Sequence, residues 1–130
     1  MFLVDTTVWI DYFSGKETPQ VAYLITAISQ HENICLCSVV LTEILQGISN
    51  NKEYEMTLQA LSALILLPMT QATFILAANI YRSLRARGVT IRKTIDCLIA
   101  AVCIENNIPF LHSNRDFDPI EKYCKLKIAR

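Results

Sequence analysis

The sequence predicts an α/β domain in which a mainly parallel sheet lies between layers of helices. Short apolar runs alternate along the chain with segments of helical periodicity, which is the pattern of β–α–β units. The 130 residues are 52% apolar and 18% charged, a composition that suits one packed domain covering residues 1–130. The chain has only 3 Gly and 4 Pro, so a linker or low-complexity tract is not expected.

The chain begins with a strand candidate followed by a helix candidate. Residues 2–4 are apolar and end at Asp5, and Thr6 or Thr7 can cap a helix rich in aromatic residues. Pro19 is expected to open a second helix, because apolar residues then recur at i, i+3, i+4 and i+7. The order is strand, acidic residue, helix, helix.

The middle of the chain repeats this order. Residues 34–37 form the next strand candidate, and Ser38 can cap a helix whose apolar stripe leaves Glu43 to one side. A further helix is expected over 52–61, and the apolar run 65–67 before a proline predicts a third strand.

The last third contains two longer helix candidates. One covers 71–87 and is closed by Gly88, and the other covers 95–105 after a possible Thr94 cap. The remaining expected elements are a fourth strand at 109–112, a polar loop at 113–119 and a short fifth strand at 126–128. These units complete the expected α/β sandwich.

Composition excludes several classes of protein. The 5 cysteines show no paired C-x-x-C spacing and stand among apolar residues, so we expect core thiols rather than a zinc site or a disulfide scaffold. The longest apolar run, 60–69, is about half the length of a membrane span. We therefore expect no membrane insertion and a cytoplasmic location.

The charge is unevenly distributed although the net charge is zero. Residues 1–81 carry two basic and seven acidic side chains, whereas residues 82–130 carry ten basic and five acidic ones. The basic residues before Asp96 could meet phosphate, or they could simply form a solvated helix surface. They are Arg82, Arg85, Arg87, Arg92 and Lys93.

Four acidic residues from distant segments are expected at one edge of the sheet: Asp5, Glu43, Asp96 and Asp116. Clustered carboxylates repel one another and raise one another's pKa, so such a cluster is stable mainly with divalent cations. Oxygen ligands favour Mg²⁺ or Mn²⁺. The alternative for any one of these acids is a helix cap or an ion-paired surface residue.

Four segments resemble the ordered motifs of PIN-domain ribonucleases, in particular the toxins of bacterial VapBC toxin–antitoxin modules. The segments are Leu-Val-Asp-Thr-Thr-Val-Trp-Ile at 3–10, the stretch 38–47 around Glu43, Asp-Cys-Leu-Ile-Ala-Ala at 96–101, and Leu-His-Ser-Asn-Arg-Asp-Phe-Asp at 111–118. They occur in the order of the family and cover essentially the whole chain.

The resemblance implies a three-layer PIN-like fold and a Mg²⁺- or Mn²⁺-dependent endoribonuclease that hydrolyses RNA phosphodiester bonds through metal-activated water. Asp5 and Asp96 match the principal metal ligands of the family. Glu43 matches its third acid, Asp116 its fourth, and Thr6 the hydroxyl residue beside the first aspartate. The expected partners are RNA, a VapB-like antitoxin and a second copy of the chain.

One departure concerns the last motif, where many relatives have Asp in place of Asn114. An amide ligates a metal without bringing charge, so a second metal would be held more weakly. Which of Asn114, Asp116 and Asp118 faces the site stays open at this stage.

Other functions fit the same residues. The chain could be a PIN-domain nuclease of RNA processing, or a catalytically silent module that binds RNA or protein. A mechanism that uses His31 and His112 as acid and base is a weaker alternative, because His31 is far from every motif.

For a toxin, we expect inhibition by an antitoxin at two places. A basic side chain could enter the acidic crevice, and an amphipathic helix could cover apolar surface near the first and third helices.

Overall fold

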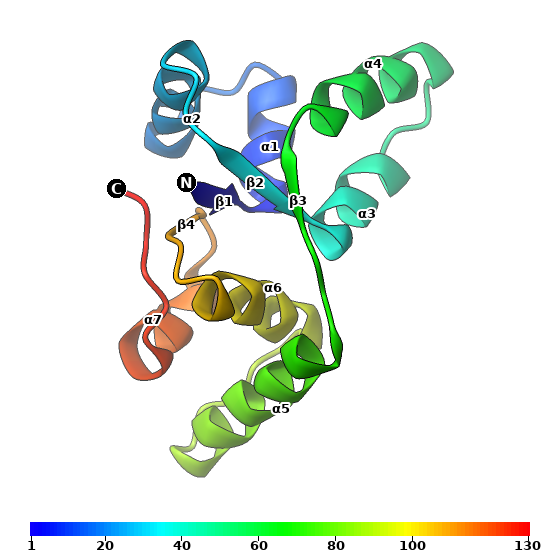
Figure 1. Ribbon diagram of the computed structural model, residues 1–130. Helices are drawn as coiled ribbons and strands as arrows, with labels where there is room; N and C mark the ends of the chain where they lie inside the picture. Colours follow the sequence, from blue (N-terminus) through cyan, green and yellow to red (C-terminus); the bar gives the residue numbers. More distant parts are fainter.

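The computed structural model describes residues 1–130 and contains one sheet of four parallel strands in the order β3-β2-β1-β4 (Figure 1). The strands are β1 (Phe2–Val4), β2 (Ile34–Cys37), β3 (Ile65–Leu67) and β4 (Phe110–Leu111). Every residue of β1, β2 and β4 is buried, as expected for a parallel sheet covered on both faces. The predicted α/β class with a parallel sheet is confirmed.

Helices cover the sheet in two groups. They are α1 (Thr6–Phe13), α2 (Pro19–Ser29), α3 (Ser38–Gln46), α4 (Asn51–Ser62), α5 (Gln71–Ala86), α6 (Thr94–Glu105) and α7 (Asp118–Cys124), with a 3₁₀ turn η1 (Arg115–Phe117). Figure 1 shows α5, α6 and α7 together on one side of the strands and α1 and α2 on the other. One continuous core joins the two groups through the sheet.

The strand order reverses direction beside β1. The strands β1, β2 and β3 follow one another outward in one direction, whereas the chain then returns to place β4 on the opposite side of β1. This reversal of direction makes a switch point, and ligands of such sheets bind beyond the carboxyl ends of the strands there. The amide of Asp5 donates to the carbonyl of Leu111 at 2.9 Å, which joins β1 to the end of β4 at this edge.

Three predicted helix caps are wrong by one residue. Thr6, Ser38 and Thr94 are the first residues of α1, α3 and α6, and their side chains do not cap these helices. The extended residue before each of them takes the cap position, because the strand or loop keeps its extended backbone up to the point where the helix begins. By contrast, Thr18 caps α2 as its spacing before Pro19 allows, since its side chain accepts from the amide of Val21 at 3.0 Å.

The predicted fifth strand is also wrong. Ile128 makes a single parallel bridge to Phe110, with backbone hydrogen bonds of 2.9 Å on each side of the bridge. Because β4 is only two residues long, it offers too little backbone for a longer ladder. The segment after the expected polar loop instead forms α7, which begins at Asp118 with Pro119 in its first turn and buries Ile120.

The cysteines are all free, as predicted, and only Cys124 is not fully buried. The structure has no helix that combines the length and the apolar character needed to cross a membrane.

Candidate active site

Two aspartates are almost completely buried at the carboxyl edge of the sheet. Asp5 is 4% exposed at the end of β1, and Asp96 is 5% exposed in the first turn of α6. Their sequence neighbours Val4 and Cys97 are fully buried, so each carboxylate lies at the margin of the apolar core. Buried carboxylates are costly unless they are paired, which makes their surroundings informative.

The pKa of Asp5 is raised to about 6, chiefly by burial. The carboxylate of Glu43 contributes to this rise, because like charges repel. The opposing effect is local: the Thr7 hydroxyl donates to Oδ2 of Asp5 at 2.9 Å, and backbone amides of Thr6 and Thr7 also stabilise the ionised form. Asp5 is therefore oriented by its hydrogen bonds but not neutralised.

Burial likewise raises the pKa of Asp96 to about 6, and the charges of Asp5, Asp116 and Glu43 add to this effect. Lys93 is the one nearby group that lowers it. Oδ2 of Asp96 is buried and has no hydrogen-bond partner. The charges of Asp5, Asp116 and Glu43 thus all act on Asp96.

The other two acids have partners. Oγ1 of Thr6 donates to Oε1 of Glu43 at 2.8 Å, which ties α1 to α3. Asp116 is bound by Arg92, whose Nη2 lies 3.0 Å and 3.3 Å from its two oxygens. Asp5, Glu43 and Asp116 thus each accept a hydrogen bond from a side chain, whereas Asp96 does not.

The donor set suits a hard divalent cation. Carboxylate oxygens are the ligands that Mg²⁺ and Mn²⁺ prefer, and the unpartnered oxygen of Asp96 is a buried polar atom that a cation would satisfy. Nowhere in the chain do three or more Asp, Glu, His or Cys side chains stand ready to hold one ion. Asp5 and Asp96 are the two buried acids that could hold a cation, whereas Glu43 is bonded to Thr6 and Asp116 to Arg92.

The structure distinguishes the three candidates of the last motif. Oδ1 of Asn114 accepts from the amide of Asp116 at 3.0 Å, so Asn114 caps η1 rather than facing the acids. Asp118 is exposed, and its charge acts on His112. Asp116 is the member whose charge acts on Asp96.

The two histidines are not brought together. His31 follows α2 and lines a surface hollow with Trp9 and Leu64. His112 stacks on Phe110, its Nδ1 accepts from the amide of Asn114 at 3.1 Å, and burial lowers its pKa. Nothing in this arrangement pairs an acid with a base.

Two functional contacts were not predicted from the sequence. Thr7 orients Asp5, which the spacing of two residues at the start of a helix could have suggested. The pairing of Arg92 with Asp116 joins positions 24 residues apart, and no local pattern signals it. The other predicted basic residues are exposed, and the guanidinium of Arg87 lies 4.6 Å from the centre of the Tyr123 ring.

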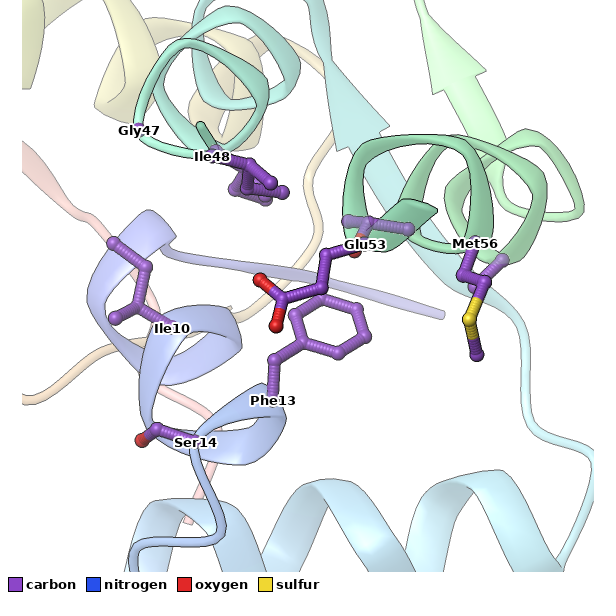
Figure 2. Close-up of a pocket in the computed structure, with 10 residues that line it drawn as sticks. Ile10, Phe13, Ser14, Gly47, Ile48, Glu53 and Met56 are labelled. Atoms are coloured by element: carbon purple, nitrogen blue, oxygen red, sulfur yellow. The ribbon is translucent and has the colours of Figure 1, made fainter. Parts of the chain in front are cut away.

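A separate apolar groove of about 710 Å³ lies between α1, α3 and α4 (Figure 2). It contains none of the four acids. Figure 2 shows the carboxylate of Glu53 directed into the space between Ile10, Phe13 and Ile48. The groove is lined by Ile10, Phe13, Ser14, Ile44, Gly47, Ile48, Glu53, Met56, Thr57 and Ala60.

Residues 2–123 match the PIN domain family. The chain is 31% identical, over 99% of its length and 98% of theirs, to a VapC ribonuclease of Mycobacterium bovis and to ribonuclease VapC11 of Mycobacterium tuberculosis. Its fold is similar to that of VapBC2 from Rickettsia felis bound to a promoter DNA fragment, with a TM-score of 0.77, 17% identity and coverage of 98% and 96% of the two chains. It is also similar to FitAcB from Neisseria gonorrhoeae, with a TM-score of 0.75, 20% identity and coverage of 100% and 97%.

Proposed function

This chain belongs to the PIN domain family, and we propose that it is a divalent-metal-dependent endoribonuclease that acts as the toxin of a type II toxin–antitoxin pair. The observation that carries the proposal is the pair of buried carboxylates Asp5 and Asp96 at the switch point of the sheet, neither of which has an ion-pair partner. The relatives at 31% identity that cover the whole chain are named as VapC ribonucleases, which supports RNA as the substrate.

The buried aspartates are the proposed binding site for Mg²⁺ or Mn²⁺. Asp5 and Asp96 would hold the cation, which contributes positive charge beside the phosphoryl oxygens and a water of lowered pKa. Thr7 fixes the orientation of Asp5, and Thr6 fixes that of Glu43 across the crevice. No serine, cysteine or histidine nucleophile is required.

The exposed cations beside the crevice are suited to the RNA backbone. Arg85 and Arg87 lie at the end of α5, and Lys93 directly precedes α6 and acts on Asp96. A cationic rim beside an acidic centre attracts phosphates and leads them towards the cation.

Expression in a bacterial host tests the function. Wild-type chain should arrest growth and fragment RNA, whereas Asp5→Asn should do neither while accumulating to the same level. Equal toxicity of the two proteins would refute the proposed catalytic site. RNA breakdown by purified protein, stopped by EDTA and restored by Mn²⁺, separates a nuclease from a silent binding module.

The groove between α1, α3 and α4 is our proposed antitoxin site. Its walls are apolar, and the single carboxylate of Glu53 suits an amphipathic helix that carries one basic residue. A side chain can be added at Gly47 without backbone strain, because a Cβ there would make only ordinary contacts of 3.6 Å and 3.8 Å. Gly47→Trp should weaken antitoxin binding at least about tenfold by filling the groove. Unchanged binding would exclude this groove.

We also propose that the toxin forms a dimer. Exposed apolar side chains outside the groove, such as Leu66 on β3 and Phe74 and Ile75 on α5, offer a surface for a second copy. Light scattering should give the mass of two chains, and a single-chain mass would contradict the proposal.

A further inference from the structure

Arg92 makes a contact that its place among the basic residues does not explain. It lies in the loop between α5 and α6, four residues before Asp96, and its Nη2 contacts both carboxylate oxygens of Asp116. The other arginines of this basic stretch, in contrast, form no ion pair with an acidic residue. One cation of the proposed RNA-binding rim is thus bound to an acid of the proposed metal site.

We propose that Arg92 is a positioning residue that neutralises Asp116 in the metal-free site and moves to an RNA phosphate when substrate binds, which frees Asp116 for the cation. This inference rests on the proposed nuclease function and assigns a role to one further residue of the same site.

The exposure of the two side chains permits such an exchange. The Arg92 side chain is 77% exposed and that of Asp116 only 22% exposed. An exposed ion pair contributes little to the stability of a fold, so the contact can be given up at small cost. Nε and Nη1 of Arg92 make no hydrogen bond to the protein, which leaves donors of a planar fork that can bind a phosphate from the solvent side.

In the metal-free protein, the ion pair between Arg92 and Asp116 reduces the repulsion among the acidic side chains. The negative charge of Asp116 acts on the buried carboxylate of Asp96, so a cation on Asp116 relieves repulsion within the acidic site. A bound divalent cation does the same, and it also repels a guanidinium at that position. Arg92 and the cation therefore compete for Asp116, and a phosphate that draws Arg92 away favours the cation.

This competition predicts that binding of RNA and of metal help each other. By linkage, if RNA strengthens metal binding, metal strengthens RNA binding by the same factor. Without Arg92, RNA binding should no longer strengthen metal binding, and metal binding should no longer strengthen RNA binding. A purely structural role for the ion pair would not move the two affinities in opposite directions.

The test uses Arg92→Gln and a matched control. Arg130→Gln removes another Arg–carboxylate pair of the same 3.0 Å length and similar exposure, which joins Glu121 to the C-terminal residue outside the acidic site. Mn²⁺ affinity is measured by titration calorimetry without RNA, and affinity for a short RNA oligonucleotide is measured by fluorescence anisotropy in EDTA. Arg92→Lys is included because it keeps the charge but loses the fork.

Arg92→Gln should bind Mn²⁺ about two- to fivefold more tightly than wild type and RNA about threefold or more weakly. Arg130→Gln should change neither, and Arg92→Lys should fall between wild type and Arg92→Gln. Unchanged or weaker Mn²⁺ binding by Arg92→Gln would overturn the inference while leaving the nuclease intact. Failure of the wild type to bind Mn²⁺ would overturn the proposed function and the inference with it.

Discussion

The interior of the sheet and its carboxyl edge are buried to nearly the same degree, but burial has opposite effects on the free energy of folding in the two regions. Leu3 and Val4 of β1 are 0% exposed, and the next residue, Asp5, is only 4% exposed. Removing the first two side chains from water stabilises the fold, whereas removing the carboxylate costs free energy. The same contrast recurs on α6, where the buried Asp96 is followed by the fully buried Cys97.

The comparison shows which buried residues serve folding and which serve the site. In the interior, each side chain finds apolar neighbours and needs nothing further. At the edge, Asp96 keeps an oxygen without a partner and has a raised pKa. The cost at the edge is a reason to expect a ligand there, because a cation would relieve it.

The largest expected effect is a loss of RNA cleavage, which should follow the replacement of a buried carboxylate but not of an exposed one. Asp96→Asn should lower RNA cleavage at least about 100-fold, because the amide removes the charge that would hold the cation. Asp118→Asn, at an exposed position near η1, should leave cleavage within about twofold of wild type. A single-turnover assay with a labelled RNA measures both, and similar losses in the two variants would break the distinction between buried and exposed acids.

The next effect concerns the interior. Leu3→Ala should lower the free energy of unfolding by about 3 kcal/mol, because it removes a fully buried side chain and leaves a cavity. Leu66→Ala on the edge strand β3, where the side chain is 55% exposed, should cost less than about 1 kcal/mol. Urea denaturation compares the two, and equal losses would contradict the assigned core.

At the carboxyl edge of the sheet, replacing a buried residue should raise the free energy of unfolding rather than lower it. The size of this gain depends on pH. The pKa of Asp5 is about 6 in the folded protein and 3.8 ordinarily, so the folded state binds more protons between these values. The metal-free wild type must therefore lose stability as pH rises through that window. Asp5→Asn lacks this loss and should be more stable than wild type by about 3 kcal/mol at neutral pH, with the difference vanishing below about pH 4. Urea denaturation in EDTA across this range checks the slope, and a difference that is independent of pH would refute the assignment.

A smaller effect is expected at the hydroxyl that holds Glu43. Thr6→Val removes the 2.8 Å hydrogen bond and should lower cleavage about fivefold, the equivalent of about 1 kcal/mol. Thr6→Ser keeps the hydroxyl and should retain most of the activity. If the valine variant is as active as wild type, the orientation of Glu43 does not depend on Thr6.

The sequence was sufficient to predict the parallel sheet, and it also predicts that the four acids lie at one edge of that sheet. Both depend on local signals, namely short apolar runs and the residues that follow them, and the switch-point rule then brings distant segments to one edge. Three helix starts were misplaced by one residue because a Thr or Ser can stand at the cap or just inside the helix with little change in local pattern.

Other features could not be predicted because they depend on how loops meet in space. The segment after Asn114 was expected to be a loop, yet η1 and α7 form there, where Phe117 and Ile120 pack into the core. Pro119 and the acidic residues beside it were the available signal for a helix start. The pairing of Arg92 with Asp116 left no such signal, because it joins an exposed loop to the turn η1, and only the folded chain brings these two segments together.

The most direct test of the account compares the thermal stability of wild type and Asp96→Asn with and without metal. In EDTA the wild type should unfold at the lower temperature, because its acids repel one another at neutral pH. In saturating Mn²⁺ the order should reverse, because the cation stabilises only the protein that retains both aspartates. If Mn²⁺ shifts the two proteins equally, or if the wild type is already the more stable in EDTA, then Asp5 and Asp96 are not a metal site held together by a cation.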